Sequence, residues 1–521
     1  MRLKLLATCL FLPAAIGSAH GQQPTTPVPP RVVEKPAALT ADGIPAVPMD
    51  LAERTRPYME FRTAGFTSWN PRDRSMTIST RFGNTNQIHN VAAPMGDRRQ
   101  ISFEAEPVGG QWSPTGDVLL AQKDIGGNEF FQIYTLANGR LTLLTDGASR
   151  NGFNAWSHDG RWIAYTSTRR NGADNDIYVM DPRDPSTNRM VAQVRGGGWG
   201  VRDFHPDGRR AVVGEYLSIT KSNLHMLDLT SGQMTPIGDH ARDIAYGGAQ
   251  FSRDGTLWAT SDEGSEFQRL GTIDLATGRF RPVVSDINWD VESFDIAEDG
   301  SFIAFTTNEA GRSKLYILDP RTGRRRSVDT IPAGLIGGLE IAPWGDIGLT
   351  LTSARSPADA YSVNPQTLAL TRWTQSETGG LDPNVNVEPE LIEVASFDGE
   401  RVSGFLYRPD PRRFPGPRPL IVNIHGGPEA QSRPGFMGRN NYLLNEQGIA
   451  IFFPNVRGSS GYGKRFLGLD NGAALRENSV LDIGAFLDRF ERDAAIDRSR
   501  IAVTGGSYGG YMCYASAIRY G

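Results

Sequence analysis

A short pattern that recurs seven times constrains the fold of this chain more than any other feature. Each copy has an aromatic or aliphatic anchor, two residues that are often Ser-Pro, and an Asp-Gly-like turn that leads into a β-rich run. The copy Trp156-Ser-His-Asp-Gly160 is typical of the set. The seven anchors lie 43 to 48 residues apart and are Trp69, Trp112, Trp156, Phe204, Phe251, Ile296 and Ile341. Such a regular period indicates repeated units that stack on one another.

Units of this length with several strands each match the four-stranded blade of a β-propeller. One unit cannot bury both faces of its sheet, so neighbouring units must stack around a ring. The sequence therefore predicts a seven-bladed β-propeller over residues 63–380. A sandwich or solenoid of similar strands is the alternative, and the regular period disfavours it.

Composition excludes several other classes of protein. The chain has 521 residues, of which 39% are hydrophobic and 21% charged, so it can bury large cores and is not globally disordered. A net charge of −4 does not indicate a nucleic-acid partner. The sequence has no Cys/His cluster, no H-E-x-x-H motif and no nucleotide-binding P-loop, so we expect no metal and no other cofactor.

The first 21 residues have the pattern of a secretory signal peptide. Residues 1–4 include the basic Arg2 and Lys4, and the apolar run at 5–16 is shorter than the roughly 20 residues that span a bilayer. Small residues, Ala19 and Gly21, precede the expected cut. We therefore expect a periplasmic or secreted protein with no membrane span, although a buried N-terminal helix is an alternative. Residues 22–47 are rich in proline and predict an extended tether.

After about residue 385 the sequence changes character. Residues 391–395 and 402–407 predict an antiparallel hairpin. Apolar strands then alternate with helical patterns, such as the amphipathic stretch at 479–492. Buried strands separated by helices indicate a doubly wound parallel sheet, so residues 385–521 are predicted to be an α/β domain.

The strand at 501–504 runs into Gly505-Gly-Ser507-Tyr-Gly509-Gly510 and then into a helical stretch. This is the G-x-S-x-G nucleophile elbow in its required setting of strand, sharp turn and helix, which predicts an α/β-hydrolase with Ser507 as nucleophile. Gly505 and Gly509 are expected where a Cβ would clash with the neighbouring chain. A tight turn without chemistry is the alternative.

Acyl transfer also needs hydrogen-bond donors for the developing oxyanion. One is expected to be the backbone N–H of Tyr508, which follows the nucleophile. The other is expected from the loop His425-Gly-Gly-Pro428, with the N–H of Gly427 as the candidate. His425 precedes the serine in the chain, so we interpret it as a residue that shapes the loop rather than as the catalytic base.

Three ordered motifs now carry a resemblance to a known family. They are His425-Gly-Gly-Pro428, Asn455-Val-Arg-Gly-Ser-Ser-Gly-Tyr-Gly463 and Gly505-Gly-Ser-Tyr-Gly-Gly-Tyr511. With the seven repeats, the chain resembles the prolyl oligopeptidase family of serine peptidases, and its His-Gly-Gly-Pro form is similar to the acylaminoacyl-peptidase and dipeptidyl-peptidase-like branch. The resemblance implies a serine exo- or oligopeptidase that acts on short peptides, with the propeller restricting access. It also implies that residues 48–62 pack on the hydrolase domain.

The sequence departs from this family in one respect. The family's order is Ser, then Asp, then His, but none of the 14 residues after Ser507 is Asp, Glu or His. We therefore expect the chain to be a C-terminally truncated fragment of a longer active enzyme, with an incomplete hydrolase domain and with no peptidase activity of its own.

Acidic residues in propeller loops are candidates for binding the free amino group of a peptide, as propeller glutamates do in some relatives. The candidates are Glu129, Glu263 and Glu266, and solvated loop acids are the alternative interpretation. Arg457 is interpreted as a structural tie. Oligomeric state cannot be predicted.

Three functions therefore stay open at this stage. A serine peptidase is favoured, an esterase would use the same elbow, and a non-catalytic propeller scaffold would explain the missing acid and base.

Overall fold

The computed structural model describes residues 31–521, so the expected signal peptide and the first part of the expected tether lie outside the described residues. The chain divides into two compact units between Arg56 and Pro57. In the described part of the smaller unit the chain turns back on itself, because Val32 and Pro48 form an antiparallel bridge. Helix α1 (Met49–Met59) follows this bridge.

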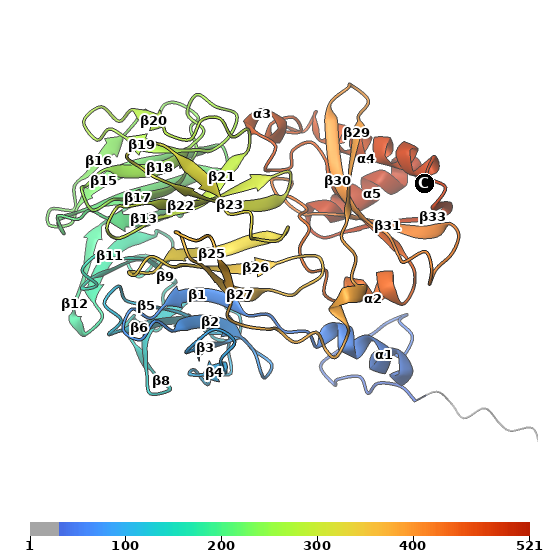
Figure 1. The fold of residues 1–521 in the computed structure, drawn as a ribbon, viewed down its shortest axis with the longest axis horizontal. Helices are drawn as coiled ribbons and strands as arrows, with labels where there is room; N and C mark the ends of the chain where they lie inside the picture. The colour runs from blue at the N-terminus through green and yellow to red at the C-terminus, as the bar shows by residue number, and fades with distance from the viewer. Residues whose placement is uncertain (1–30) are drawn as a thin grey trace, which may run out of the picture. The chain divides into compact units, whose positions relative to one another are not determined.

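Seven four-stranded antiparallel sheets, each made of four consecutive strands, confirm the seven-bladed β-propeller (Figure 1). We number them blade 1 to blade 7 in chain order. The strands of blades 1 to 4 are β1 (Gly65–Trp69), β2 (Met76–Thr80), β3 (Gln87–Val91), β4 (Arg99–Gln100), β5 (Gly109–Trp112), β6 (Leu119–Lys123), β7 (Gln132–Ala137), β8 (Arg140–Leu143), β9 (Asn151–Trp156), β10 (Ile163–Ser167), β11 (Asp176–Asp181), β12 (Asp184–Ala192), β13 (Trp199–Phe204), β14 (Arg210–Ser218), β15 (Lys221–Asp228) and β16 (Met234–Ile237). The strands of blades 5 to 7 are β17 (Tyr246–Phe251), β18 (Leu257–Ser261), β19 (Arg269–Ile273), β20 (Phe280–Pro282), β21 (Asp290–Ile296), β22 (Ile303–Glu309), β23 (Arg312–Leu318), β24 (Arg325–Ser327), β25 (Leu335–Ile341), β26 (Ile347–Thr352), β27 (Asp359–Val363) and β28 (Leu370–Arg372).

Each anchor of the repeat is the last residue of the first strand of its blade, for example Trp69 in β1 and Phe204 in β13. The glycine of the following turn has a positive φ in blades 2 to 7, as at Gly116 (68°) and Gly345 (99°). Blade 1 has Asp73 at this position, and its positive φ (60°) falls one residue later, at Arg74. The turn therefore has one shape in blades 2 to 7, where glycine adopts this conformation easily, and another in blade 1, where Arg74 N–H donates to Asn70 O.

Side chains from one blade accept hydrogen bonds from the next blade around the ring. Four residues that directly precede an anchor accept from the anchor N–H of the following blade. They are Ser68 from Trp112 at 3.0 Å, Asp203 from Phe251 at 2.7 Å, Asp295 from Ile341 at 2.5 Å and Glu340 from Trp69 at 3.2 Å. The last of these joins blade 7 to blade 1, so the ring closes through side chains and packing and not through a shared strand.

Aromatic packing completes this closure between blade 7 and blade 1. The ring of Trp69 contacts Trp344 and Trp373 edge to face, with centroids 5.1 and 5.3 Å apart. Trp69 is almost fully buried, with 2% of its surface exposed. Gly348 of β26 leaves room for this ring, because a Cβ there would lie 2.7 Å from Trp69 Nε1.

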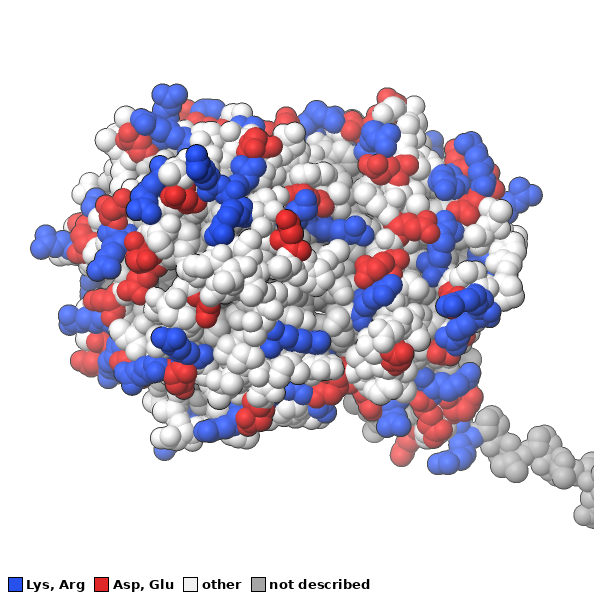
Figure 2. Space-filling view, in the orientation of Figure 1, with Lys and Arg blue, Asp and Glu red and all other residues white. Residues whose placement is uncertain are grey.

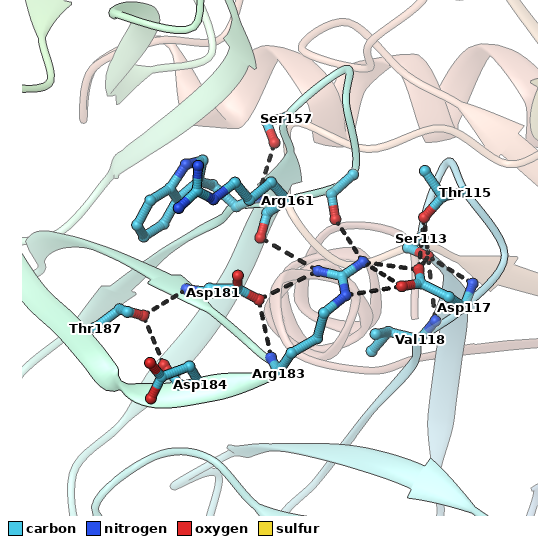
Figure 3. A network of polar contacts seen from close by, with 12 residues as sticks. Ser113, Thr115, Asp117, Val118, Ser157, Arg161, Asp181, Arg183, Asp184 and Thr187 are labelled. Carbon is cyan, nitrogen blue, oxygen red and sulfur yellow. Dashed lines mark hydrogen bonds and ion pairs between the residues drawn. The ribbon is translucent and has the colours of Figure 1, made fainter.

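An arginine fork links blade 3 to blade 2 (Figure 3). Arg183 donates from Nε and Nη2 to the two carboxylate oxygens of Asp117, both at 2.7 Å, and also from Nη2 to Gly160 O at 3.0 Å. These bonds and those from Ser113 and Thr115 hold the pKa of Asp117 well below its usual range. The bidentate geometry makes this pair stronger than a single surface contact.

The α/β domain contains one five-stranded sheet in the order β29-β30-β32-β31-β33. The pairs β29–β30 and β30–β32 are antiparallel, whereas β31 pairs in parallel with β32 and with β33. Phe452 packs on Phe486 and Phe490, which places the core between the sheet and α4. The elements are η1 (Pro383–Val385), β29 (Glu390–Ala395), β30 (Arg401–Tyr407), β31 (Arg418–Ile424), α2 (Asn440–Asn445), β32 (Ala450–Asn455), α3 (Lys464–Leu467), α4 (Arg476–Glu491), β33 (Ile496–Gly505) and α5 (Tyr508–Tyr520).

Two residues of the segment at 48–62 contact this domain. Tyr58 donates to Glu446 at 2.6 Å and lies edge to face on Tyr442, and Phe61 packs against Phe436. Elsewhere, positive and negative side chains alternate over the face shown in Figure 2, without a large area of one sign. Within residues 31–521, no helix is both long enough and apolar enough to cross a bilayer.

Candidate active site

Ser507 lies in the sharp turn between β33 and α5, where the G-x-S-x-G pattern predicts the nucleophile. Its backbone has φ of 54° and ψ of −122°, which is a strained conformation for a residue with a side chain. Such strain is expected of a nucleophile elbow, because the turn lifts the hydroxyl out of the sheet edge.

The two glycines of the elbow lie against backbone atoms. A Cβ on Gly505 would lie 2.7 Å from the carbonyl carbon and oxygen of Gly509. A Cβ on Gly509 would overlap the carbonyl oxygen of Ile424, at the end of β31. The neighbouring strand therefore leaves no space for a side chain at either position.

The loop after β31 approaches Ser507 closely. A Cβ on Gly426 would lie 3.2 Å from Ser507 Cβ and 3.8 Å from Ser507 Oγ. In the described chain, no backbone hydrogen bond uses the N–H of Gly427 or of Tyr508. Both predicted oxyanion donors are therefore uncommitted, and Tyr508 is also the first residue of α5, where the helix dipole favours negative charge.

His425 is held away from catalysis by its own hydrogen bonds. Its Nδ1–H donates to Gly426 O at 2.7 Å, and its Nε2 accepts from the Ser459 hydroxyl at 3.0 Å. Burial lowers the pKa of His425 below its usual value. The ring is therefore neutral, with one nitrogen bonded within its own loop and the other to Ser459 after β32.

A buried polar network that our sequence reasoning missed supports the start of α5. The Tyr508 hydroxyl lies 2.9 Å from Ser479 Oγ and donates to Asp470 at 3.3 Å, and Arg476 pairs with the same carboxylate at 2.8 Å. Asp470 is completely buried, and this burial raises its pKa. These residues lie 28 to 37 positions before Ser507, so no local motif links them to the elbow.

Arg457 is a structural tie, as the sequence suggested. It is 2% exposed and donates to the buried carboxylate of Asp482 from Nε and Nη2, while Nη1 and Nη2 reach Asp398 at 2.8 and 3.0 Å. The ring of Phe397 lies 4.7 Å from its guanidinium carbon. Arg457 therefore joins the hairpin loop, the loop after β32 and α4.

A cavity of about 570 Å³ lies between blades 4 to 6 and the α/β domain. Its propeller wall includes Gly247, Gly248 and Asp290, and its other wall is the segment 460–467 after Ser459. Burial raises the pKa of Asp290 to about 6, with further contributions from Glu292 and Asp262. The two domains are joined beside the cavity, where Lys464 pairs with Asp262 at 3.1 Å and Arg433 with Glu292 at 2.6 Å.

The structure does not bring the three candidate amine-binding acids together. Glu129 is largely exposed and lies 3.6 Å from Arg150, and Glu263 pairs with Arg242 at 2.7 Å. Only Glu266 lines the cavity, and its carboxylate accepts from the N–H of Arg465 at 2.7 Å.

No described residue supplies a base to Ser507. Its hydroxyl makes no hydrogen bond with any residue of the described chain. The structure therefore places Ser507 beside Gly426 of the loop after β31, with no hydrogen-bonded imidazole among the described residues.

Known peptidases are similar to this chain in sequence. Residues 434–520 match the sequence model of the prolyl oligopeptidase family. The chain is 24% identical over 505 residues to an uncharacterized peptidase, YuxL, of Bacillus subtilis, covering 85% of this chain and 69% of that protein. It is 26% identical to dipeptidyl-peptidase 5 of Porphyromonas gingivalis and 27% identical to dipeptidyl aminopeptidase BIII of Pseudoxanthomonas mexicana, covering 60% and 77% of this chain. It spans only 48% and 59% of those two relatives.

Solved structures show the same fold. A puromycin hydrolase matches with a TM-score of 0.72 and 17% identity, covering 89% of this chain and 76% of that one. A structure from a study of two prolyl endopeptidases matches with a TM-score of 0.75 and 18% identity, covering 90% of this chain and 72% of that one.

Proposed function

Because residues 434–520 belong to the prolyl oligopeptidase family, we propose that this protein is a serine peptidase that hydrolyses short peptides through an acyl-enzyme on Ser507. The observation that carries the proposal is the strained backbone of Ser507 at the start of α5, with Gly426 of the loop after β31 packed against it. The names of its relatives, which include dipeptidyl peptidases, support peptides as the substrate class.

In this mechanism Ser507 Oγ attacks the peptide carbonyl and its proton passes to a base. The carbonyl oxygen becomes an oxyanion, which accepts hydrogen bonds from the N–H groups of Gly427 and Tyr508. Loss of one such donor typically costs about 2.7–4 kcal/mol of transition-state stabilisation. The propeller restricts the substrate to peptides that fit between the domains.

The proposal needs an acid and a base that residues 508–521 do not contain. It therefore includes a longer form of the protein that supplies both, and residues 1–521 alone are expected to be inactive. The intact mass of the protein purified from its native source tests this part. A product ending at Gly521 that still hydrolyses peptides would reject it.

A fluorophosphonate probe tests the nucleophile on the same native protein. We expect covalent labelling at Ser507, no labelling of Ser507→Ala, and normal labelling of the control Ser499→Ala, which changes an exposed serine of β33. Faster turnover of peptides than of matched esters would indicate a peptidase, and the reverse would indicate an esterase. A native protein that is not labelled would favour the third function, a non-catalytic scaffold, which the absence of an acid and base after Ser507 supports.

The proposal also includes export. The apolar run at 5–16 and the small residues at 19 and 21 support it, and N-terminal sequencing of the mature protein is expected to begin at Gln22.

A further inference from the structure

A buried carboxylate that the proposed mechanism does not use lies close to the elbow. Asp470 follows α3 and is completely buried. Its Oδ2 accepts from Arg476 Nη1 at 2.8 Å and from the Tyr508 hydroxyl at 3.3 Å. Its Oδ1 is also buried and has no hydrogen-bond partner among residues 31–521. An unsatisfied buried acceptor is costly, so stability alone does not account for this carboxylate.

Another completely buried acid of the α/β domain shows the contrast. Asp482 lies on α4, and both of its oxygens are bonded. Its Oδ1 accepts from Ser396 at 2.6 Å and from Arg457 Nη2 at 2.8 Å, and its Oδ2 accepts from Arg457 N at 2.8 Å. An acid with a purely structural role is expected to be satisfied in this way, and Asp470 is not.

Asp470 acts on the residue after the nucleophile by two routes. Tyr508 is the first residue of α5, and its N–H is an oxyanion donor in the proposed mechanism. The carboxylate contacts the Tyr508 hydroxyl directly, and it also holds Arg476, whose guanidinium carbon lies 5.4 Å from the centre of the Tyr508 ring. The side chain of Tyr508 is therefore held both at its hydroxyl and over the face of its ring, which restricts the first turn of α5.

The same carboxylate lies against the loop after β32. A Cβ on Gly458 would be 2.3 Å from Asp470 Oδ1 and 2.6 Å from Oδ2, so glycine leaves the space that the carboxylate occupies. The next residue, Ser459, donates to His425 at 3.0 Å. His425 begins the loop that contains Gly427, the other donor of the proposed mechanism. Asp470 therefore contacts α5 on one side and, on the other, the loop that holds the segment with Gly427.

We propose that Asp470 is a positioning residue that fixes the spacing between the two oxyanion donors, the N–H groups of Tyr508 and Gly427. This inference rests on the proposed peptidase function and adds to it a residue that does not touch the substrate. Such donors must lie about 2.7–3.1 Å from the oxygen that develops charge in the transition state. Loss of Asp470 should therefore slow bond formation and leave substrate binding unchanged.

Saturation kinetics of fluorophosphonate labelling of the native protein separate these two effects. They give the reversible binding constant of the probe and the first-order rate of attack by Ser507. Asp470→Asn keeps the volume of the side chain and removes the charge that holds Arg476. We expect the rate of attack to fall about ten- to a hundredfold, less than the roughly 10²–10³-fold typical of complete loss of a donor, with the binding constant unchanged. With a peptide substrate the same variant should lower kcat and leave KM unchanged.

Three further variants separate positioning from loss of stability. Asp176→Asn changes a completely buried acid of blade 3 that pairs with Arg170 at 2.6 Å, so it should lower the Tm without slowing attack. Arg476→Lys keeps an ion pair with Asp470 but removes the planar group over Tyr508, and should slow attack severalfold even if Asp470→Asn does not fold. Tyr508→Phe should slow Asp470→Asn less than it slows the wild type, because the two side chains act through one contact.

An unchanged rate of attack in Asp470→Asn would overturn the inference, as would a loss confined to the binding constant. If Asp176→Asn slows attack as much as Asp470→Asn does, loss of stability explains both results and the positioning role is rejected. A wild-type native protein that is not labelled at all would overturn the proposed peptidase function and this inference with it, whereas the other results overturn the inference alone.

Discussion

Substitution of Glu340 tests whether the hydrogen bond that closes the propeller ring is sensitive to pH. Glu340 lies at the end of β25 and accepts from the N–H of Trp69 in blade 1. Burial raises its pKa to about 8, the Trp69 hydrogen bond opposes this, and the nearby charge of Asp295 adds to it. The neutral carboxyl is therefore favoured at the closure of the ring.

The sign and size of the effect follow from this shift. A carboxyl with a raised folded-state pKa carries no penalty below its unfolded value, 4.5, and destabilises the fold increasingly as pH rises towards about 8. A shift of this size corresponds to about 5 kcal/mol above pH 8 and about 3 kcal/mol at pH 7. These are upper limits, because Glu340 is only partly buried and solvent therefore screens its charge.

Glu340→Gln removes the ionisation and keeps an oxygen that can accept from Trp69. Thermal unfolding at pH 5.5, 7 and 8.5 is the assay, with Trp fluorescence as the signal. We expect the variant to exceed the Tm of the wild type least at pH 5.5 and by several degrees at pH 8.5. Glu298→Gln, an exposed acid in the turn after β21, is the matched control and should leave the pH dependence unchanged. A variant that is no more stable than the wild type at pH 8.5 would refute the reasoning.

Three other substitutions test the elbow and the blades. Gly509→Ala should abolish fluorophosphonate labelling of the native protein, because its Cβ overlaps Ile424 O; normal labelling would contradict the geometry. Tyr508→Phe removes the hydroxyl that supports α5 and should slow labelling severalfold, while unchanged kinetics would show that the network is dispensable. Arg183→Met should lower the free energy of unfolding by about 1 kcal/mol at pH 7. The difference in stability should shrink as the pH falls, because protonation of Asp117, whose pKa is depressed, removes its ion pair with Arg183. A stability difference that does not change with pH would show that this ion pair is not its cause.

The architecture could be predicted because its signals are local. An anchor, a turn and a strand lie within about ten residues of one another, so each blade can be identified from a short stretch of sequence. The structure places each of the seven anchors at the end of the first strand of its blade. The elbow is equally local, since Gly505, Ser507 and Gly509 are contiguous with one strand and one helix.

The contacts between distant segments could not be predicted in the same way. The acids before three anchors, Asp203, Asp295 and Glu340, are visible in the sequence, but their partners are defined only when the ring closes. Likewise, nothing in the sequence near Arg202 indicates that it lines a cavity, because the cavity is also formed by side chains from blades 5 and 6 and the α/β domain. Glu266 shows the converse, because a loop acid predicted to bind an amine accepts a backbone N–H across the domain interface.

The closure of the propeller also has a consequence for its synthesis. Trp69 N–H and the carboxylate of Glu340 are separated by 271 positions, and the Trp344 and Trp373 rings that bury Trp69 are made even later. At about 5–20 residues per second, the first blade waits roughly 15 to 55 s on the ribosome before its partner emerges. During that time a large aromatic surface on the nascent chain has no native cover, so the first blade is where a chaperone would be needed most.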